Sequence, residues 1–207
     1  FHCELAEESL RTRCIEDARK WIQTALEIDA KCVRASLIEA GMEESAGNPR
    51  TAIEVYRRVE QQDPEYLPDT IIPLQRCHTA LGAEEEFQDF LSGVVRRHGG
   101  IMAQLLHADL VAAKSGNEAA MSYLASELSG RPSVPVINSL LDLIMRGMGE
   151  PVRGKLAVVR DAAARMARDR PVYRCNHCGF AARLLHWQCP GCIHWNTVKP
   201  VHGVEID

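Results

Sequence analysis

Residues 173–200 read YRCNHCGFAARLLHWQCPGCIHWNTVKP, and this stretch decides how the C-terminal part of the chain folds. It contains two Cys-x-x-Cys pairs, Cys175 with Cys178 and Cys189 with Cys192, separated by ten residues. Four thiolates at this spacing can surround one tetrahedral metal ion. A segment this short cannot bury a sufficient hydrophobic core, so a metal ion is the expected source of its stability. The sequence therefore predicts one metal on Cys175, Cys178, Cys189 and Cys192.

The residues around the cysteines refine this prediction. Gly179 can adopt positive φ, and Gly191 is expected to turn the second loop. Four thiolates suit either zinc or a single iron, so the ligand residues do not determine which of the two metals binds. The Cys-x-x-Cys-Gly-Phe and Cys-Pro-Gly-Cys forms resemble rubredoxin knuckles. Four thiolates already complete the site, so the nearby histidines are expected at the surface and not as ligands. These histidines are His177, His186, His194 and His202.

The other four cysteines, Cys3, Cys14, Cys32 and Cys77, stand singly along the chain. We expect them to be small buried side chains in a reducing compartment. Aromatic residues gather in the C-terminal segment, whereas alanine is concentrated before it. Because Pro171 disfavours helix in the residue before it, the boundary is placed near Asp169-Arg170-Pro171. Residues 171–207 are thus predicted to be a separate rubredoxin-like domain.

Upstream of this boundary, the chain repeats with the period of tetratricopeptide repeats, about 34 residues. Small residues recur at two positions, large apolar residues at a third, and a closing proline at a fourth, as in that repeat class. The four registers are Ala6, Ala40, Leu74 and Ala108; Ala18, Ala52, Glu86 and Ala120; Ile22, Tyr56, Phe90 and Leu124; and Ala30, Pro64, His98 and Pro132. Glu86 and His98 depart from the pattern.

The repeats predict a division of the chain into antiparallel helix pairs. We expect tetratricopeptide repeats over 1–132, at about 1–32, 33–66, 67–100 and 101–132, with turns at 47–49, 81–82 and 115–117. Residues 133–170 are expected to form a degenerate repeat or capping helices, at about 134–148 and 151–169. The predicted fold class is an all-α tetratricopeptide (helical-repeat) solenoid with a small C-terminal rubredoxin-like metal-binding domain.

Composition excludes several classes of function. Of 207 residues, 46% are hydrophobic and 25% charged, and the formal net charge is −4, so no strongly basic nucleic-acid surface is expected. No apolar run reaches the length of a spanning helix, and no signal peptide is visible. Because the chain begins at Phe1 without Met, we expect it to be a fragment. His107, Asp109 and Ser115 are interpreted as ordinary polar residues, and no enzymatic activity is predicted.

Helical repeats followed by a rubredoxin-like knuckle resemble the lipopolysaccharide assembly protein B (LapB) family of Gram-negative bacteria. The resemblance covers essentially the whole chain and is strongest at 5–35 (LAEESLRTRCIEDARKWIQTALEIDAKCVRA) and 173–200. It implies an inner-membrane adaptor with one N-terminal anchor upstream of this sequence and this portion on the cytoplasmic side. The implied partners are the protease FtsH, the deacetylase LpxC, whose degradation the family promotes, and the inner-membrane regulator LapC. The implied cofactor is one ion of iron or zinc on the four cysteines.

Two other functions remain open from the residues. A rubredoxin-type electron-transfer or redox-sensing protein on a helical scaffold would need iron and a sulfur edge near solvent. A zinc-ribbon nucleic-acid binder is disfavoured, because 171–207 offers only Arg174, Arg183 and Lys199 as strong bases. The residues do not determine whether the protein associates with a second copy of itself. The sequence favours a non-enzymatic adaptor whose knuckle folds back onto the helices.

Overall fold

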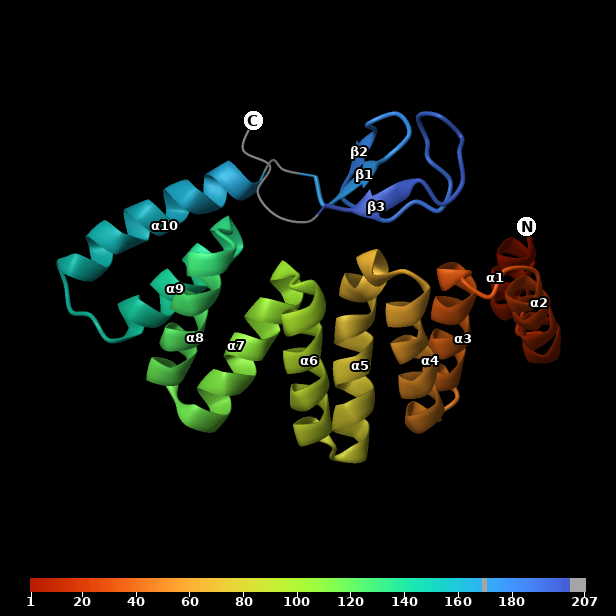
Figure 1. Cartoon of the computed structure of the whole chain (residues 1–207), viewed down its shortest axis with the longest axis horizontal. Helices are drawn as coiled ribbons and strands as arrows, with labels where there is room; N and C mark the ends of the chain where they lie inside the picture. The colour runs from red at the N-terminus through yellow and green to blue at the C-terminus, as the bar shows by residue number, and fades with distance from the viewer. Residues whose placement is uncertain (169–170, 202–207) are drawn as a thin grey trace. The chain divides into compact units, whose positions relative to one another are not determined.

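The computed structural model describes residues 1–168 and 171–201. Over these residues ten α-helices precede a small three-stranded sheet (Figure 1). The chain forms two compact units, Phe1–Asp89 and the residues from Phe90 onward, and the boundary lies within helix α6 (Glu84–His98). Among the described residues, none of the helices combines the length and the apolar character needed to span a bilayer.

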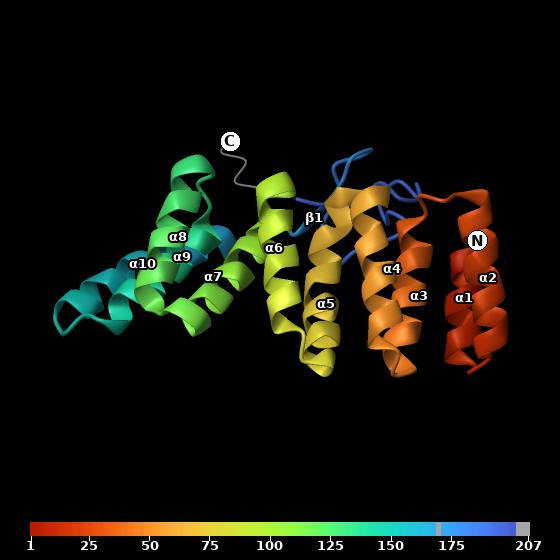
Figure 2. The same cartoon turned by 60° about the horizontal axis from the view of Figure 1, so that its bottom comes forward.

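The first unit is built from successive helices joined by short turns (Figure 2). Helix α1 packs beside α2, α3 beside α4, and α4 beside α5. These elements are α1 (His2–Arg11), α2 (Ile15–Ile28), α3 (Val33–Ser45), α4 (Pro49–Gln62), the 3₁₀ turn η1 (Pro64–Tyr66) and α5 (Leu67–Leu81). Helices α3 and α5 begin at Val33 and Leu67, which lie one repeat length apart, as the sequence pattern requires.

The predicted turns lie between helices. Gly47 has a φ of 79°, and its amide and that of Asn48 donate to the carbonyls of Glu44 and Glu43 at the end of α3. Pro49 then occupies the first turn of α4, where its missing N–H is not needed. Gly82, with a φ of 64°, ends α5 in the left-handed conformation that glycine tolerates best. Both predicted breaks in this unit are therefore confirmed.

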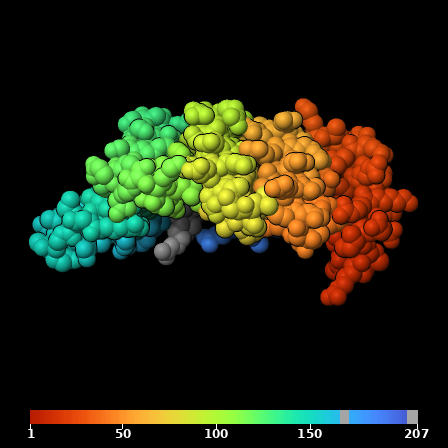
Figure 3. All heavy atoms as spheres, turned by 90° about the horizontal axis from the view of Figure 1, so that it is seen from below, coloured from red at the N-terminus to blue at the C-terminus, as the bar shows by residue number. Residues whose placement is uncertain are grey.

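The repeat registers form the core of the first unit. Small residues let the helix backbones approach, and larger apolar residues fill the space that remains. Figure 3 shows one face of these helices with all of their heavy atoms. The buried register positions here are Ala6, Ala18, Ile22, Ala40, Ala52, Tyr56 and Leu74. The third repeat departs as its sequence indicates, because Glu86 is exposed and its neighbour Phe87 is buried instead. Pro73 lies inside α5, which continues through it.

The second unit continues the helical pattern after α6. It contains α7 (Ile101–Ser115), α8 (Asn117–Gly130), α9 (Val134–Arg146) and α10 (Val152–Arg168), each packed against the next. Helix α7 begins at Ile101, again one repeat length after the start of α5. The predicted break at 115–117 is confirmed, because Gly116 separates α7 from α8. The shared core consists of Ala108, Ala120, Leu124, Val136 and Leu143.

The two predicted helical stretches after residue 133 are present as α9 and α10. Helix α9 ends two residues earlier than expected and α10 begins one residue later, whereas the predicted end of α10 at residue 169 lies outside the described residues. Val136 and Leu143 are buried on α9, as the spacing predicts. Val159 on α10 is 55% exposed. Within the part of the chain that the structure describes, α10 packs mainly against α9.

The C-terminal sheet consists of β1 (Tyr173–Cys175), β2 (Ala181–Ala182) and β3 (Val198–Pro200) in the order β2-β1-β3. Both pairings are antiparallel, with Tyr173 opposite Ala182 on one side and Pro200 on the other. Helical repeats followed by a small metal-domain sheet confirm the predicted fold class. The domain limits 1–132, 133–170 and 171–207 stay predictions, and Asp169 and Arg170 at the proposed boundary lie outside the described residues.

Candidate metal centre

The fold brings the four predicted cysteines together at one point. Their sulfur atoms all lie within 4.8 Å of one another. Cys175 Sγ is 3.7 Å from Cys192 Sγ, and Cys178 Sγ is 3.6 Å from Cys189 Sγ. Four sulfurs placed tetrahedrally around zinc, each about 2.3 Å from it, would be about 3.8 Å apart. The four cysteines are therefore placed to bind one metal ion.

Each Cys-x-x-Cys pair is held by the same backbone pattern. The Gly179 amide donates to the Cys175 carbonyl at 2.9 Å, and the Cys175 amide donates to the Phe180 carbonyl at 2.8 Å. Fourteen residues later, the Ile193 amide donates to the Cys189 carbonyl at 2.8 Å, and the Cys189 amide donates to the His194 carbonyl at 2.9 Å. Two copies of one turn thus present two sulfurs each to a common centre.

The two turns use their glycines differently. Gly179 has a φ of 76°, as predicted, but the equivalent position of the second turn is Ile193, with a φ of 63°. Gly191 lies within the second turn, at residues 190–192, as expected, but the positive φ is adopted by Ile193. A Cβ on Gly191 would lie 3.4 Å from Cys178 Sγ and 3.4 Å from Phe180 Cβ. The absence of a side chain at Gly191 instead lets the second turn approach the first closely.

Polar groups around Cys175 favour its thiolate. Desolvation raises the pKa of Cys175, but the Thr197 hydroxyl and the amides of Cys178 and His177 outweigh it and lower this pKa to about 6. Thr197 Oγ1 lies 3.2 Å from Cys175 Sγ. A hydroxyl in this position can donate to a metal-bound thiolate and orient it. Thr197 was missed by the sequence reasoning, because nothing in the cysteine spacing points to it.

Cys178 shows why the site needs a positive ion. The Phe180 amide lowers the pKa of Cys178, whereas desolvation and its three cysteine neighbours raise it, and the net result is about 12. Four sulfurs this close cannot all carry negative charge unless a cation compensates them. A divalent or trivalent metal supplies that compensation and holds the thiols deprotonated.

The site has a buried side and a solvent side. Cys175 and Cys189 are buried, Cys178 is exposed and Cys192 is half-buried. The small core beneath the buried pair contains Val198, with Tyr173, Phe180 and Leu185 packed around it. Leu184, Ile193 and Trp195 remain exposed at 73%, 70% and 46%. The knuckle thus covers one pair of sulfurs and leaves the other near solvent.

The histidines of this domain lie outside the four-sulfur set. His177 and His194 are exposed, and their rings stack with centroids 3.8 Å apart. Together with Cys192 they form a second group of potential ligand atoms, but the Cys192 sulfur already faces the other three sulfurs. His186 lies edge-on to Phe180, and His202 lies outside the described residues.

The polar residues considered for catalysis are not assembled into a site. His107 packs edge-on against Tyr123, with ring centroids 4.7 Å apart, and burial lowers the pKa of His107. Asp109 and Ser115 are exposed. Asp109 follows His107 by two residues on the same helix, so these two side chains do not share a face.

The four scattered cysteines differ in burial. Cys3 and Cys77 are buried as predicted, Cys32 is half-buried, and Cys14 is exposed, so the prediction is wrong for Cys14.

Comparison with known proteins shows which proteins this chain resembles. Residues 173–200 match a family model described as a rubredoxin metal binding domain. The chain is 32% identical over 206 residues to lipopolysaccharide assembly protein B of Escherichia coli strain K12, which covers 99% of this chain and 53% of that protein. The protein of the same name from Haemophilus influenzae Rd is 29% identical over 206 residues, 99% of this chain and 52% of its own length. The chain thus spans about half the length of these curated relatives.

Proposed function

We propose that this chain, a homologue of lipopolysaccharide assembly protein B along nearly all of its length, is the repeat-and-knuckle portion of an adaptor that regulates lipopolysaccharide supply. In this proposal the adaptor is held at the inner membrane by an upstream anchor, with this portion on the cytoplasmic side. It promotes degradation of LpxC by FtsH, scaffolds assembly proteins, and is counteracted by LapC. The observation that carries the proposal is one alignment of 206 residues through both the helical repeats and the metal knuckle.

The geometry supports an adaptor in two ways. Stacked helix pairs offer a broad surface for a partner and need no nucleophile or general base. The knuckle adds a second surface, because Leu184 and Ile193 are exposed beside the metal site. An anchored protein that binds both a membrane protease and its substrate raises the effective concentration of one near the other. Proximity is the means of action we propose.

The proposal can be tested by following LpxC in cells. The full-length anchored protein is replaced by a Cys175→Ser, Cys178→Ser variant, and LpxC decay is followed after translation is blocked. We expect LpxC to persist longer, because the knuckle can no longer hold its metal. Cys14→Ser is the matched control, since Cys14 is exposed and outside the site. It should leave LpxC decay unchanged.

Cross-linking from membranes tests the partners directly. Capture of the anchored wild-type protein should recover FtsH, LpxC and LapC, and loss of the knuckle should weaken recovery of FtsH or LpxC. If FtsH and LpxC are both missing from the wild-type capture, the adaptor proposal is wrong. If both are captured but LpxC decay is unaffected by the cysteine variant, the metal has no part in this function.

Electron transfer is the second candidate, and one observation favours it. The exposed Cys178 leaves a sulfur edge of the site near solvent, as a rubredoxin-type exchange of electrons would need. Metal analysis of protein purified without oxygen, followed by reversible reduction monitored by visible absorption, separates the two candidates. A colourless zinc-loaded protein excludes electron transfer, whereas the adaptor role permits either metal.

A further inference from the structure

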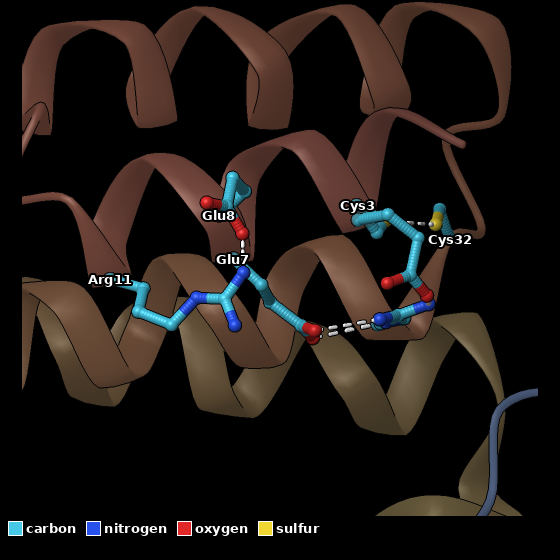
Figure 4. A network of polar contacts seen from close by, with 7 residues as sticks. Cys3, Glu7, Glu8, Arg11 and Cys32 are labelled. Atoms are coloured by element: carbon cyan, nitrogen blue, oxygen red, sulfur yellow. Dashed lines mark hydrogen bonds and ion pairs between the residues drawn. The ribbon is translucent and has the colours of Figure 1, made fainter.

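Two cysteines of the first unit lie together, although they are far from each other in sequence. Cys3 is on α1, and Cys32 directly precedes α3. Their sulfur atoms are 3.7 Å apart, and Figure 4 shows the two side chains facing each other. Neither takes part in the metal centre.

The two thiols have different environments. Cys3 is 7% exposed, whereas Cys32 is half-buried and is the more exposed of the two. The Cys3 thiol lowers the pKa of Cys32 to about 6, with help from the Ala35 amide and Arg34, against the opposing effects of burial and Asp29. The same contact with Cys32, together with burial, raises the pKa of Cys3. These opposite shifts favour the thiolate at Cys32 and the protonated thiol at Cys3.

An ion-pair network holds the two sulfurs in this arrangement. The buried Arg34 guanidinium donates to Glu7 from Nε at 3.1 Å and from Nη2 at 2.7 Å, and Nη1 lies 2.6 Å from Glu4 Oε1. Glu4 and Glu7 are on α1 and Arg34 is on α3, so the network joins the two helices beside the thiols (Figure 4). The network therefore holds α1 and α3 together close to the two cysteines.

We propose that Cys32 and Cys3 form a peroxide-reactive thiol pair, in which Cys32 is oxidised first and Cys3 then closes a disulfide between α1 and the start of α3. A reactive thiol that is accessible and lies next to a second, resolving cysteine is the arrangement expected of a reversible oxidation site. Cys14 lacks this arrangement, because it is exposed but its sulfur contacts the Thr12 carbonyl.

The chemistry balances with hydrogen peroxide as the only oxidant. The Cys32 thiolate attacks one peroxide oxygen, an S–O bond forms, the O–O bond breaks, and the released hydroxide takes a proton from solvent to become water. The Cys3 sulfur then attacks Cys32, the S–S bond forms as the S–O bond breaks, and hydroxide leaves with the proton of Cys3 as a second water. Both sulfurs are oxidised and the peroxide is reduced. Closing the bond brings the sulfurs from 3.7 Å to about 2.0 Å apart.

Peptide mapping tests the pair in the intact chain. Zinc-loaded protein, in which the knuckle cysteines are occupied, is treated with equimolar hydrogen peroxide, alkylated and digested with trypsin without reduction. We expect a cross-linked peptide joining residues 1–11 to residues 32–34, which disappears on reduction. The rate of its formation should rise through pH 6 and then level off, because the Cys32 thiolate is the reacting species.

Variants assign the two roles. In Cys3→Ser, Cys32 should remain as a sulfenic acid that dimedone traps, and the cross-linked peptide should be lost. In Cys32→Ser, both products should be lost, whereas Cys14→Ser should behave as wild type. Helix content by circular dichroism verifies that each variant is folded. The proposal is overturned if wild-type protein shows no 1–11 to 32–34 cross-link, or if Cys14 is oxidised while Cys32 stays reduced.

Discussion

The helical repeats and the metal knuckle reach a stable fold by different physical means. In the repeats, positions one repeat length apart are buried together, and Ala6, Ala40 and Leu74 are each 0% exposed. In the knuckle, the buried cluster is Cys175, Cys189 and Val198, so two of its three members are sulfur ligands. The hydrophobic effect stabilises the first region without any cofactor. The second has too little apolar surface for that, and a metal ion must supply the difference.

The largest expected effect is loss of the metal. Replacing Cys175 and Cys178 by serine removes half of the ligands, and binding free energies of structural zinc sites are on the order of 10 kcal/mol or more. We expect the knuckle to unfold, while the helical signal in circular dichroism stays close to that of wild type. Metal content and the amide NMR signals of residues 173–200 report the loss. If the amide NMR signals of residues 173–200 stay dispersed without metal, the knuckle does not need a metal ion to fold, and the contrast with the repeats is wrong.

The converse change affects the repeats alone. Leu74→Ala removes a side chain that is 0% exposed in the first unit, and such truncations cost about 2–5 kcal/mol. We expect chemical denaturation of the helical signal to shift to lower denaturant, with one metal still bound per chain. Leu81→Ala on the same helix is the matched control, because Leu81 is 37% exposed. Loss of metal in the Leu74 variant would mean that the two regions do not fold independently.

Much of this contrast could be predicted from the sequence, because each region contains a recurring pattern of residues. The recurring registers of small and large apolar residues predicted which side chains are buried. The spacing of the four cysteines predicted that their sulfurs meet. A periodic pattern reports a constraint that every repeat must satisfy, so each copy adds evidence for the same structure.

Features without a repeated pattern could not be predicted. Thr197 reaches Cys175 only because β3 pairs with β1, and this pairing carries no sequence signal of its own. Ile193 adopts positive φ although it is not a glycine, because the second turn copies the backbone of the first. Cys3 and Cys32 each look like an isolated cysteine, and they become a pair only when α1 packs against α3.

A smaller effect is expected when a larger side chain is placed at a buried position of the repeats. Ala52→Leu places extra methylene groups at a position that is 0% exposed, and such overpacking costs about 1–3 kcal/mol. Glu86→Leu is the matched substitution at the same register position of the next repeat. Glu86 is exposed, so this change should alter stability by less than about 0.5 kcal/mol. Denaturant titration of both variants measures the difference, and equal losses would mean that the register does not define the core.

The smallest effect is expected at Thr197, which directly precedes β3 and contacts the sulfur of Cys175. Thr197→Val keeps the shape of the side chain but removes the hydroxyl 3.2 Å from Cys175 Sγ. Loss of such an outer hydrogen bond weakens metal affinity by about tenfold, or about 1.4 kcal/mol. Competition with a chelator should show this change, while Thr24→Val, on α2 and bonded to the Lys20 carbonyl, should leave affinity unchanged. An affinity equal to wild type would mean that the backbone amides alone hold the Cys175 thiolate, and that the knuckle's two turns suffice without support from β3.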